Sequence, residues 1–342
     1  MLLHSIFLSS PLSVTTAFLT LCVVFVNGLT DAPNAISTVV VTRCMSMRSA
    51  LVMSAFFNLV GVITMSKIND SVTVTVSNVV DFGGDTEKAT IALSASLFAI
   101  VLWAVVAWYF GIPTSESHAL IAGLTGSAFA INGGFNAINV DEWLKTVKGL
   151  FLSCLIGFLA GFFICRVIIV VFRNIKRTKS EIVFRWGQIF AAAAMSFMHG
   201  AQDGQKFIAV LMMSVSFSGE TTGDKPQGFI VFLCSVIMAL GTLTGGKKII
   251  KSVGMDMVRL EKYQGFSADT ASSISLLLST VSGFPVSTTH AKTTAMMGAG
   301  AARSFKSLNL STVKDIALTW ALTFPGCGLL GFVVTKVFLR MF

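Results

Sequence analysis

Two stretches of the chain repeat each other in a fixed register. Residues 111–130 read GIPTSESHALIAGLTGSAFA, and residues 283–302 read GFPVSTTHAKTTAMMGAGAA. They lie 172 residues apart, and 7 of their 20 positions are identical. The identical positions include the pairs Pro113 and Pro285, Ser115 and Ser287, and His118 and His290. Self-similarity at a fixed offset is typical of a duplicated structural unit.

A second pair of polar segments obeys the same offset. Residues 27–36 read NGLTDAPNAI and residues 199–208 read HGAQDGQKFI, so that Asp31 corresponds to Asp203. A chance similarity between apolar stretches would not give two pairs of polar motifs with the same offset. We therefore expect two copies of one unit, residues 1–172 and residues 173–342, joined by a basic linker at about 173–185.

Composition predicts a membrane protein. The chain has 342 residues, of which 54% are hydrophobic and 12% charged, whereas soluble domains average about 25% charged. A span needs about 20 apolar residues, and the first apolar stretch runs directly into a polar motif, as a retained span does. Apolar runs recur throughout, for example at Ala50–Ser66, Ile91–Phe110, Gly149–Phe172 and Phe229–Leu243. The predicted fold class is an all-α polytopic membrane protein.

The distribution of charge excludes nucleic acid as a partner and predicts orientation. The net charge is +9, but the basic residues stand in short loops between apolar runs rather than in a stripe with aromatic residues. Short cytoplasmic loops favour Lys and Arg. The linker holds the longest cluster, so we expect it in the cytoplasm; its bases are Arg173, Lys176, Arg177, Lys179 and Arg185.

Loop charges change sign between the two copies. The loop at 43–48 is basic, whereas its counterpart at 215–224 carries Glu220 and Asp224. The loop at 67–88 is acidic, and its counterpart holds Lys247, Lys248, Lys251 and Arg259 against Asp256. Opposite signs predict that the two copies cross the membrane in opposite directions. Inverted-topology repeats with a site between them are typical of secondary transporters.

The first polar motif interrupts an apolar stretch and predicts a broken helix. Gly28 and Pro33 both oppose a straight helix within residues 14–43. Broken backbone in a membrane is tolerated where it lines a cavity or is buried in protein. Asp31 and Asn34 are three residues apart and share one helical face. Together with freed carbonyls they predict a cage for Na⁺ or another hard cation, while a kink with a capping Asp31 is the simpler alternative.

The second polar motif predicts an anion site. Each stretch has a proline, a hydroxyl cluster and about 18 small residues, which we interpret as a re-entrant hairpin of two half-length helices. Hydroxyls near helix N-termini, where free amides and the positive dipole end lie, suit an oxyanion. Ordinary helix capping is the alternative. The hydroxyls concerned are those of Ser115, Ser117, Ser287, Thr288 and Thr289.

These motifs resemble those of a known family. GLTDAPNA and HGAQDGQK look like two copies of the signature GANDVANA of the inorganic phosphate transporter (PiT) family, and PTSESHA and PVSTTHA resemble its hairpin motifs. The resemblance covers nearly the whole chain. It implies a multi-pass protein of the plasma membrane that carries inorganic phosphate with Na⁺ or H⁺ and needs no other cofactor. It also implies a homodimer, and some bacterial members carry sulfate instead.

The resemblance assigns roles and exposes two departures. It implies that Asp31, Asn34 and Asp203 bind the coupling cation and phosphate, and that the five hydroxyls contact the anion. In the second signature, Gln202 and Lys206 stand where asparagines are expected. We expect Gln202, like the five hydroxyls and Glu116, to contact the substrate. An ammonium cannot ligate Na⁺. If Lys206 points inward it replaces one bound cation, which predicts that the protein uses fewer Na⁺ ions or uses H⁺. The alternative is that Lys206 forms a structural ion pair or reaches the membrane interface.

Further charged and aromatic residues lie in the same motifs. Glu116 corresponds to Thr288 in the repeat. It can accept a hydrogen bond from a protonated oxygen of phosphate and so disfavour sulfate, which has no such proton, or it can carry a proton itself. We expect His118 and His290 to orient or pack rather than to touch the substrate. Lys292 either adds positive potential near the second hairpin or reaches the membrane interface.

The leading function is therefore a cation-coupled phosphate symporter working by alternating access. The alternatives are a sulfate permease of the same architecture and an anion channel. We do not expect an enzyme, because the candidate residues Asp31, Asp203, His118, His199 and His290 match neither H-E-x-x-H nor G-x-S-x-G. No GxxxxGK[ST] loop for ATP occurs.

Overall fold

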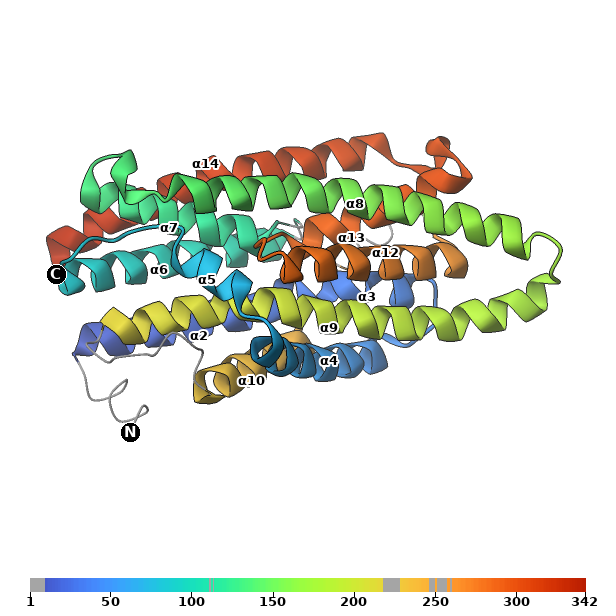
Figure 1. Ribbon diagram of the computed structural model, residues 1–342, viewed down its shortest axis with the longest axis horizontal. Coiled ribbons are helices and arrows are strands. Elements are labelled where there is room, and N and C mark those ends of the chain that lie inside the picture. Colours follow the sequence, from blue (N-terminus) through green and yellow to red (C-terminus); the bar gives the residue numbers. More distant parts are fainter. Residues whose placement is uncertain are drawn as a thin grey trace.

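The protein is a bundle of long helices (Figure 1). The computed structural model describes residues 10–110, 112, 114–217, 228–245, 250, 257–258 and 260–342. Within these ranges all regular elements are helical, apart from two isolated bridges, Val80–Ile138 and Val258–Leu308. The α-helices are α2 (Pro11–Thr30), α3 (Ala32–Val41), α4 (Met47–Ile68), α5 (Ser71–Ser77), α6 (Thr86–Phe110), α7 (Glu116–Asn132), α8 (Val140–Phe172), α9 (Arg177–Phe217), α10 (Gly228–Thr244), α12 (Lys262–Val281), α13 (Thr288–Arg303) and α14 (Leu310–Met341). Short 3₁₀ turns, η1 (Phe135–Ala137) and η3 (Phe305–Ser307), precede α8 and α14.

Several helices can cross a membrane. In the described part of the chain, five segments are long and apolar enough to do so: Pro11–Val41, Met47–Ile68, Thr86–Phe110, Val140–Phe172 and Leu310–Met341. Large apolar side chains are exposed along α8 and α14, for example Phe151, Phe163, Leu322 and Leu329. Such faces are stable against lipid and not against water. The all-α membrane architecture predicted from composition is confirmed at this level.

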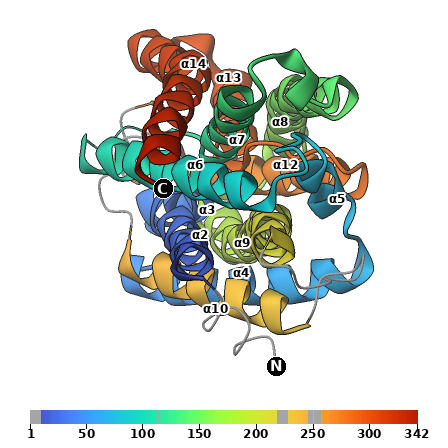
Figure 2. The same ribbon diagram turned by 90° about the vertical axis from the view of Figure 1, so that its left-hand side faces the viewer.

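The order of helices recurs along the chain, and their contacts recur in exchanged form. The series α2–α3, α4, α6, α7, α8 is followed by α9, α10, α12, α13, α14. Helix α7 packs on α14 while α13 packs on α8, and α2 packs on α10 while α9 packs on α4. Viewed along the long axis, α2, α3 and α9 lie between the α4–α10 layer and the layer of α7, α13, α8 and α14 (Figure 2).

Glycines set these exchanged contacts. A Cβ on Gly126 of α7 would lie 2.0 Å from the carbonyl oxygen of Gly328 in α14. A Cβ on Gly298 of α13, which is 172 residues further on, would lie 2.0 Å from the carbonyl oxygen of Phe158 in α8. Backbones this close exclude any side chain, which is how small residues promote helix packing in membranes.

The predicted helix break is present in one copy only. Helix α2 ends at Thr30 and α3 begins at Ala32, so that Asp31 stands between them. Pro33 has no N–H to continue the ladder of α2. In the second copy, for which no such proline predicts a break, α9 runs unbroken from Arg177 to Phe217. The physical reason is Gln205, which occupies the position of Pro33 and keeps its N–H.

The predicted division of each small-residue stretch into two half-length helices is also wrong. Residues 116–132 form the single helix α7 and residues 288–303 the single helix α13. The chain turns before these helices, so α6 pairs with α7 and α12 with α13. Figure 1 shows the first pair towards one end of the molecule and the second pair towards the other.

Part of the sequence prediction lies outside the described residues. This applies to Pro113 and to the loop charges on which opposite orientation was argued, namely Glu220, Asp224, Lys247, Lys248, Lys251, Asp256 and Arg259. The opposed orientation of the two copies thus stays a prediction.

Candidate functional site

Two helix N-termini meet at the centre of the molecule. Ser115 and Ser287 are the N-cap residues of α7 and α13, and the Ser115 hydroxyl donates to Ser287 Oγ over 2.7 Å. Each serine oxygen also accepts from a backbone amide of its own helix, that of His118 at 3.3 Å and that of His290 at 3.2 Å. Both serines are fully buried. Converging helix N-termini create a region of positive potential suited to an anion.

The two repeated aspartates are brought together beside these termini. One amide nitrogen, Asn27 Nδ2, lies 3.1 Å from Asp203 Oδ2 and 3.5 Å from Asp31 Oδ2. Both carboxylates are at most 2% exposed. Residues separated by 172 positions therefore share one hydrogen-bond donor, as the repeat predicted for a common site.

The first turn of α13 supplies hydroxyls to both aspartates. Thr289 donates to Asp31 Oδ1 over 2.9 Å, and Thr288 donates to Asp203 Oδ2 over 3.2 Å. The Asn34 amide donates to Thr289 over 2.9 Å. Adjacent residues at a helix start point in different directions, which lets α13 contact both acids at once.

Lys206 is buried in the same cluster and is 1% exposed. Its ammonium lies 2.6 Å from Asp203 Oδ1, 2.6 Å from Ser117 Oγ and 2.6 Å from the carbonyl oxygen of Val286. An ammonium has three donors, and all three are used. Lys206 thus pairs with Asp203 and does not reach the membrane interface.

Some acceptors at the centre remain available. Glu116 Oε1 accepts from the Thr30 hydroxyl over 3.1 Å. Three other oxygens, Glu116 Oε2, Asn27 Oδ1 and Asn34 Oδ1, are buried and accept nothing from the part of the chain that the structure describes. Buried polar atoms are usually satisfied, so an unsatisfied group points to a bound ligand or ion.

Two other candidates lie at the edge of this cluster. The Gln202 amide donates to the carbonyl of Phe284 over 2.7 Å and accepts from Thr280, so it joins none of the other candidates. The His118 and His290 rings form an edge-to-face pair with centroids 4.2 Å apart, and His290 stacks on Trp320. This geometry accords with the packing role expected for the histidines.

Sequence reasoning missed a second buried charge cluster. Lys292 is fully buried and pairs with Asp269 of α12, so the predicted reach to the interface is wrong. Its ammonium also lies 3.1 Å from Thr38 Oγ1 and 3.3 Å from the carbonyl of Ala35. The available signal was Asp269 itself, a lone acid within residues 262–281, because intramembrane charges are costly unless paired.

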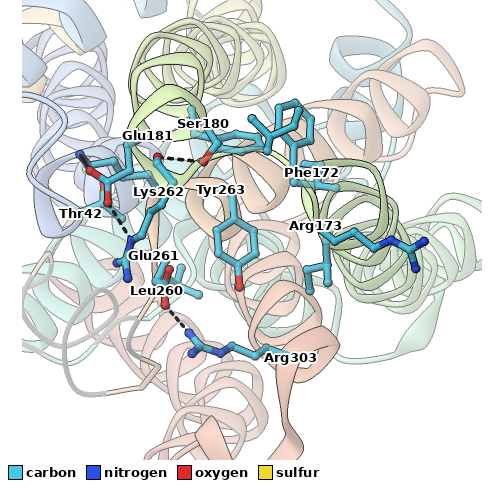
Figure 3. Close-up of a pocket in the computed structure, with 15 residues that line it drawn as sticks. Thr42, Phe172, Arg173, Ser180, Glu181, Leu260, Glu261, Lys262, Tyr263 and Arg303 are labelled. Atoms are coloured by element: carbon cyan, nitrogen blue, oxygen red, sulfur yellow. Dashed lines mark hydrogen bonds and ion pairs between the residues drawn. The ribbon is translucent and has the colours of Figure 1, made fainter.

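The polar face of α3 connects the centre with a cavity at one end of the molecule. Asp31, Asn34, Thr38 and Thr42 recur every three or four residues and so share one helical face. Thr42 lines a cavity of about 570 Å³ near the α8–α9 connection. Its other polar lining includes the ion pairs Arg177–Glu181 and Arg303–Glu261. Figure 3 shows the second of these pairs.

The comparisons with known proteins agree on one family. Residues 27–331 match the family model described as the phosphate transporter family. The chain belongs to that family. This confirms the resemblance seen in the repeated motifs, and it covers both polar segments and both central serines.

Relatives of this family member match it over nearly its whole length. It is 32% identical over 335 residues to a "probable low-affinity inorganic phosphate transporter" of Bacillus subtilis, covering 96% of this chain and 99% of that one. A protein of the same description from Rhizobium meliloti is 35% identical, with 94% and 95% covered. A solved structure described as "the sodium-dependent phosphate transporter" superposes with a TM-score of 0.84 at 20% identity, covering 97% of this chain and all of that one. The last likeness shows the fold.

Proposed function

We propose that this protein is a secondary active transporter that carries inorganic phosphate together with a cation. The observation that carries the proposal is the contact between Ser115 and Ser287, where two helix N-termini converge beside the paired acids Asp31 and Asp203. An anion site adjoining a cation site is the arrangement that symport of both requires. The names of the relatives in Bacillus and Rhizobium support phosphate as the anion.

The anion lies between α7 and α13 in this proposal. Free amides at both helix starts donate to its oxygens. The hydroxyls do so once they turn from their present acceptors, which include Ser287, Asp203 and Asp31. In the described conformation Ser115 and Ser287 touch, so binding of a phosphate requires these two residues to separate. The hydroxyls assigned to the anion are those of Ser115, Ser117, Ser287, Thr288 and Thr289, all buried. Gln202 supports the connection that leads into α13 rather than the anion itself.

Glu116 selects a protonated oxyanion. Its Oε2 accepts no bond from the described chain and lies at the first turn of α7. Phosphate carries a hydrogen that a carboxylate can accept, whereas sulfate has none, and an unpaired buried acceptor is penalised. Glu116→Gln lowers the preference for phosphate over sulfate. An unchanged preference, with an unchanged pH profile, removes this role and the alternative role as proton carrier.

The coupling cation belongs beside Asp31. Carboxylate and amide oxygens suit Na⁺. Asn34 Oδ1 and Asn27 Oδ1 accept nothing from the described chain, and Asp31 Oδ2 accepts only a 3.5 Å bond from Asn27. Asp203 fits a mobile cation less well, because Lys206, Asn27 and Thr288 already donate to its oxygens. The solved relative's dependence on sodium supports Na⁺ as one candidate, and H⁺ is the other.

Alternating access follows from two opposed repeats in this proposal. The exchanged helix contacts support a twofold relation between residues 1–172 and residues 173–342. Rocking of one repeat against the other exposes the centre first to one side of the membrane and then to the other. The polar face of α3 and the cavity at Thr42 form the route on one side. Location in the plasma membrane and assembly as a homodimer remain predictions from the family resemblance.

Uptake into proteoliposomes tests the function. Radiolabelled phosphate and sulfate are supplied separately, with a Na⁺ gradient, a proton gradient or neither. We expect phosphate to accumulate above its external concentration under one of the two gradients. Accumulation that stops at equilibrium identifies a channel, and stronger accumulation of sulfate identifies a sulfate permease.

A further inference from the structure

Lys206 sits in the kind of cage that would otherwise hold a metal cation. Its ammonium contacts a carboxylate oxygen, a hydroxyl oxygen and a backbone carbonyl oxygen, all at 2.6 Å. Sodium sites in transporters are built from the same three kinds of oxygen. The positive charge in this cage is covalently attached to α9, so it cannot be transported.

The repeat shows what stands at the corresponding place. Asn34, 172 residues earlier, occupies the position of Lys206, and its neighbour Asp31 corresponds to Asp203. Thr289, which donates to Asp31, corresponds to Ser117, which accepts from Lys206. We call the first set the α3–α13 seam and the second the α9–α7 seam. The two seams share a carboxylate and a hydroxyl at matching positions, but only the second has an ammonium at its centre.

Charge balance decides how many mobile cations the centre can take. In the α9–α7 seam, Asp203 is neutralised by Lys206 at 1% exposure. A second cation there would compete with the Lys206 ammonium for the same carboxylate and would be repelled by it in a region of low dielectric. In the α3–α13 seam, no Lys or Arg of the described chain contacts Asp31, and Asn34 Oδ1 accepts nothing from described residues.

We propose that Lys206 is a tethered cation that fills one of two repeat-related cation sites, so that each phosphate is accompanied by a mobile cation at the Asp31 site only. This rests on the proposed symport. It further implies that Lys206→Asn, which restores the side chain of the first seam, creates a second site that takes Na⁺.

The decisive experiment measures the uptake of ²²Na⁺ and of ³²P-phosphate into proteoliposomes that contain the wild type or one of three variants. We expect Lys206→Asn to take up more Na⁺ per phosphate than the wild type, and its uptake to become more strongly dependent on Na⁺. Lys206→Met has no oxygen ligand and Lys206→Arg keeps the charge, so neither gains Na⁺. Equal Na⁺-to-phosphate ratios in the wild type and Lys206→Asn overturn the proposal, as does an equal gain in Lys206→Met.

A binding measurement covers the case in which the variants do not transport. The melting temperature of each purified protein is compared in NaCl and in choline chloride, without phosphate. We expect Na⁺ to stabilise Lys206→Asn more than the wild type or Lys206→Met, because a ligand stabilises the state that binds it. If Na⁺ raises the melting temperature of Lys206→Asn no more than that of the wild type and Lys206→Met, the proposal that Lys206 replaces a bound cation is rejected. Failure of the wild type to take up any phosphate rejects the proposed function and leaves this measurement valid.

Discussion

The α3–α13 seam and the α9–α7 seam each contain one buried lysine, but at different depths. In the α9–α7 seam it is Lys206, beside Asp203 at the centre. In the α3–α13 seam it is Lys292, one helical turn beyond Thr289, where it pairs with Asp269. Both ammoniums contact one carboxylate, one hydroxyl and one carbonyl.

The positions one turn from the centre differ accordingly. The offset of 172 relates Thr38, Asp269 and Lys292 to Val210, Leu97 and Leu120, which belong to the main apolar core. One seam therefore continues as a polar path towards the cavity at Thr42, and the other is closed by apolar packing. The two copies therefore share a backbone arrangement but differ in side chains one turn from the centre. We expect water and ions to enter more easily along the polar seam than along the apolar one.

The largest effect is expected when only one member of the buried Lys292–Asp269 pair is replaced. Asp269→Leu leaves the Lys292 ammonium buried without its carboxylate, which costs about 3–5 kcal/mol of unfolding free energy. The double change Asp269→Leu with Lys292→Leu copies Leu97 and Leu120, and replacing a whole buried pair is often nearly neutral. Denaturant unfolding in detergent measures both. A double variant as unstable as the single variant contradicts the pairing.

The two central serines test whether both seams serve one anion. Ser115→Ala and Ser287→Ala each remove a donor to a charged ligand, a loss of about 1.5–3 kcal/mol. We expect the half-saturating phosphate concentration to rise about 10- to 100-fold in each. Ser311→Ala, at the exposed start of α14 and away from the cavity at Thr42, is the control and keeps the wild-type value. A change in only one of the two serine variants places the anion on one seam.

The matched glycines test the exchanged helix contacts. Gly126→Ala and Gly298→Ala each push a methyl group against a backbone carbonyl. Overpacking of this kind costs about 1–3 kcal/mol, and we expect similar losses of melting temperature in both. Gly134→Ala is the control, because a Cβ there meets nothing within 4 Å. Unequal effects at the first two positions indicate that the α7–α14 and α13–α8 contacts are not equivalent.

The smallest effect is expected at the exposed ion pair near the cavity. Glu181→Gln removes the partner of Arg177, whose side chain is 80% exposed. Surface pairs contribute at most about 1 kcal/mol and are screened by salt. Unfolding at low and high salt measures the change, which we expect to vanish at high salt. A loss comparable to that of Asp269→Leu shows that this pair is structurally essential.

The repeated motifs predicted which residues would lie close together, because the fixed offset between them is visible in the amino-acid sequence. Asp31, Asp203, Ser115 and Ser287 were found in this way, and the structure brings them to one place. The break at Asp31 followed from Pro33, whose chemistry is local.

Features that depend on long-range packing were not predictable from the letters. The carboxylate partner of Lys292 is 23 residues away. Two of the three Lys206 contacts lie outside α9, at Ser117 in α7 and at Val286 in the connection between α12 and α13. Asn27 and Val286 contribute through an amide and a carbonyl whose direction only the folded chain fixes. The course of α7 and α13 as single helices was mispredicted for the same reason, since small residues permit close packing but do not fix where the chain turns.

The hydrogen bond between Ser115 and Ser287 has to break before an anion can bind between these two residues. An incoming anion must replace a 2.7 Å hydrogen bond that the empty protein already makes, so the net gain is smaller than the sum of the new contacts, by roughly 1 kcal/mol per bond. The same bond gives the buried Ser115 hydroxyl an acceptor when no anion is bound. In the proposed transport cycle, a centre whose two serines bond to each other when empty therefore binds its anion less tightly than a centre with free hydroxyls.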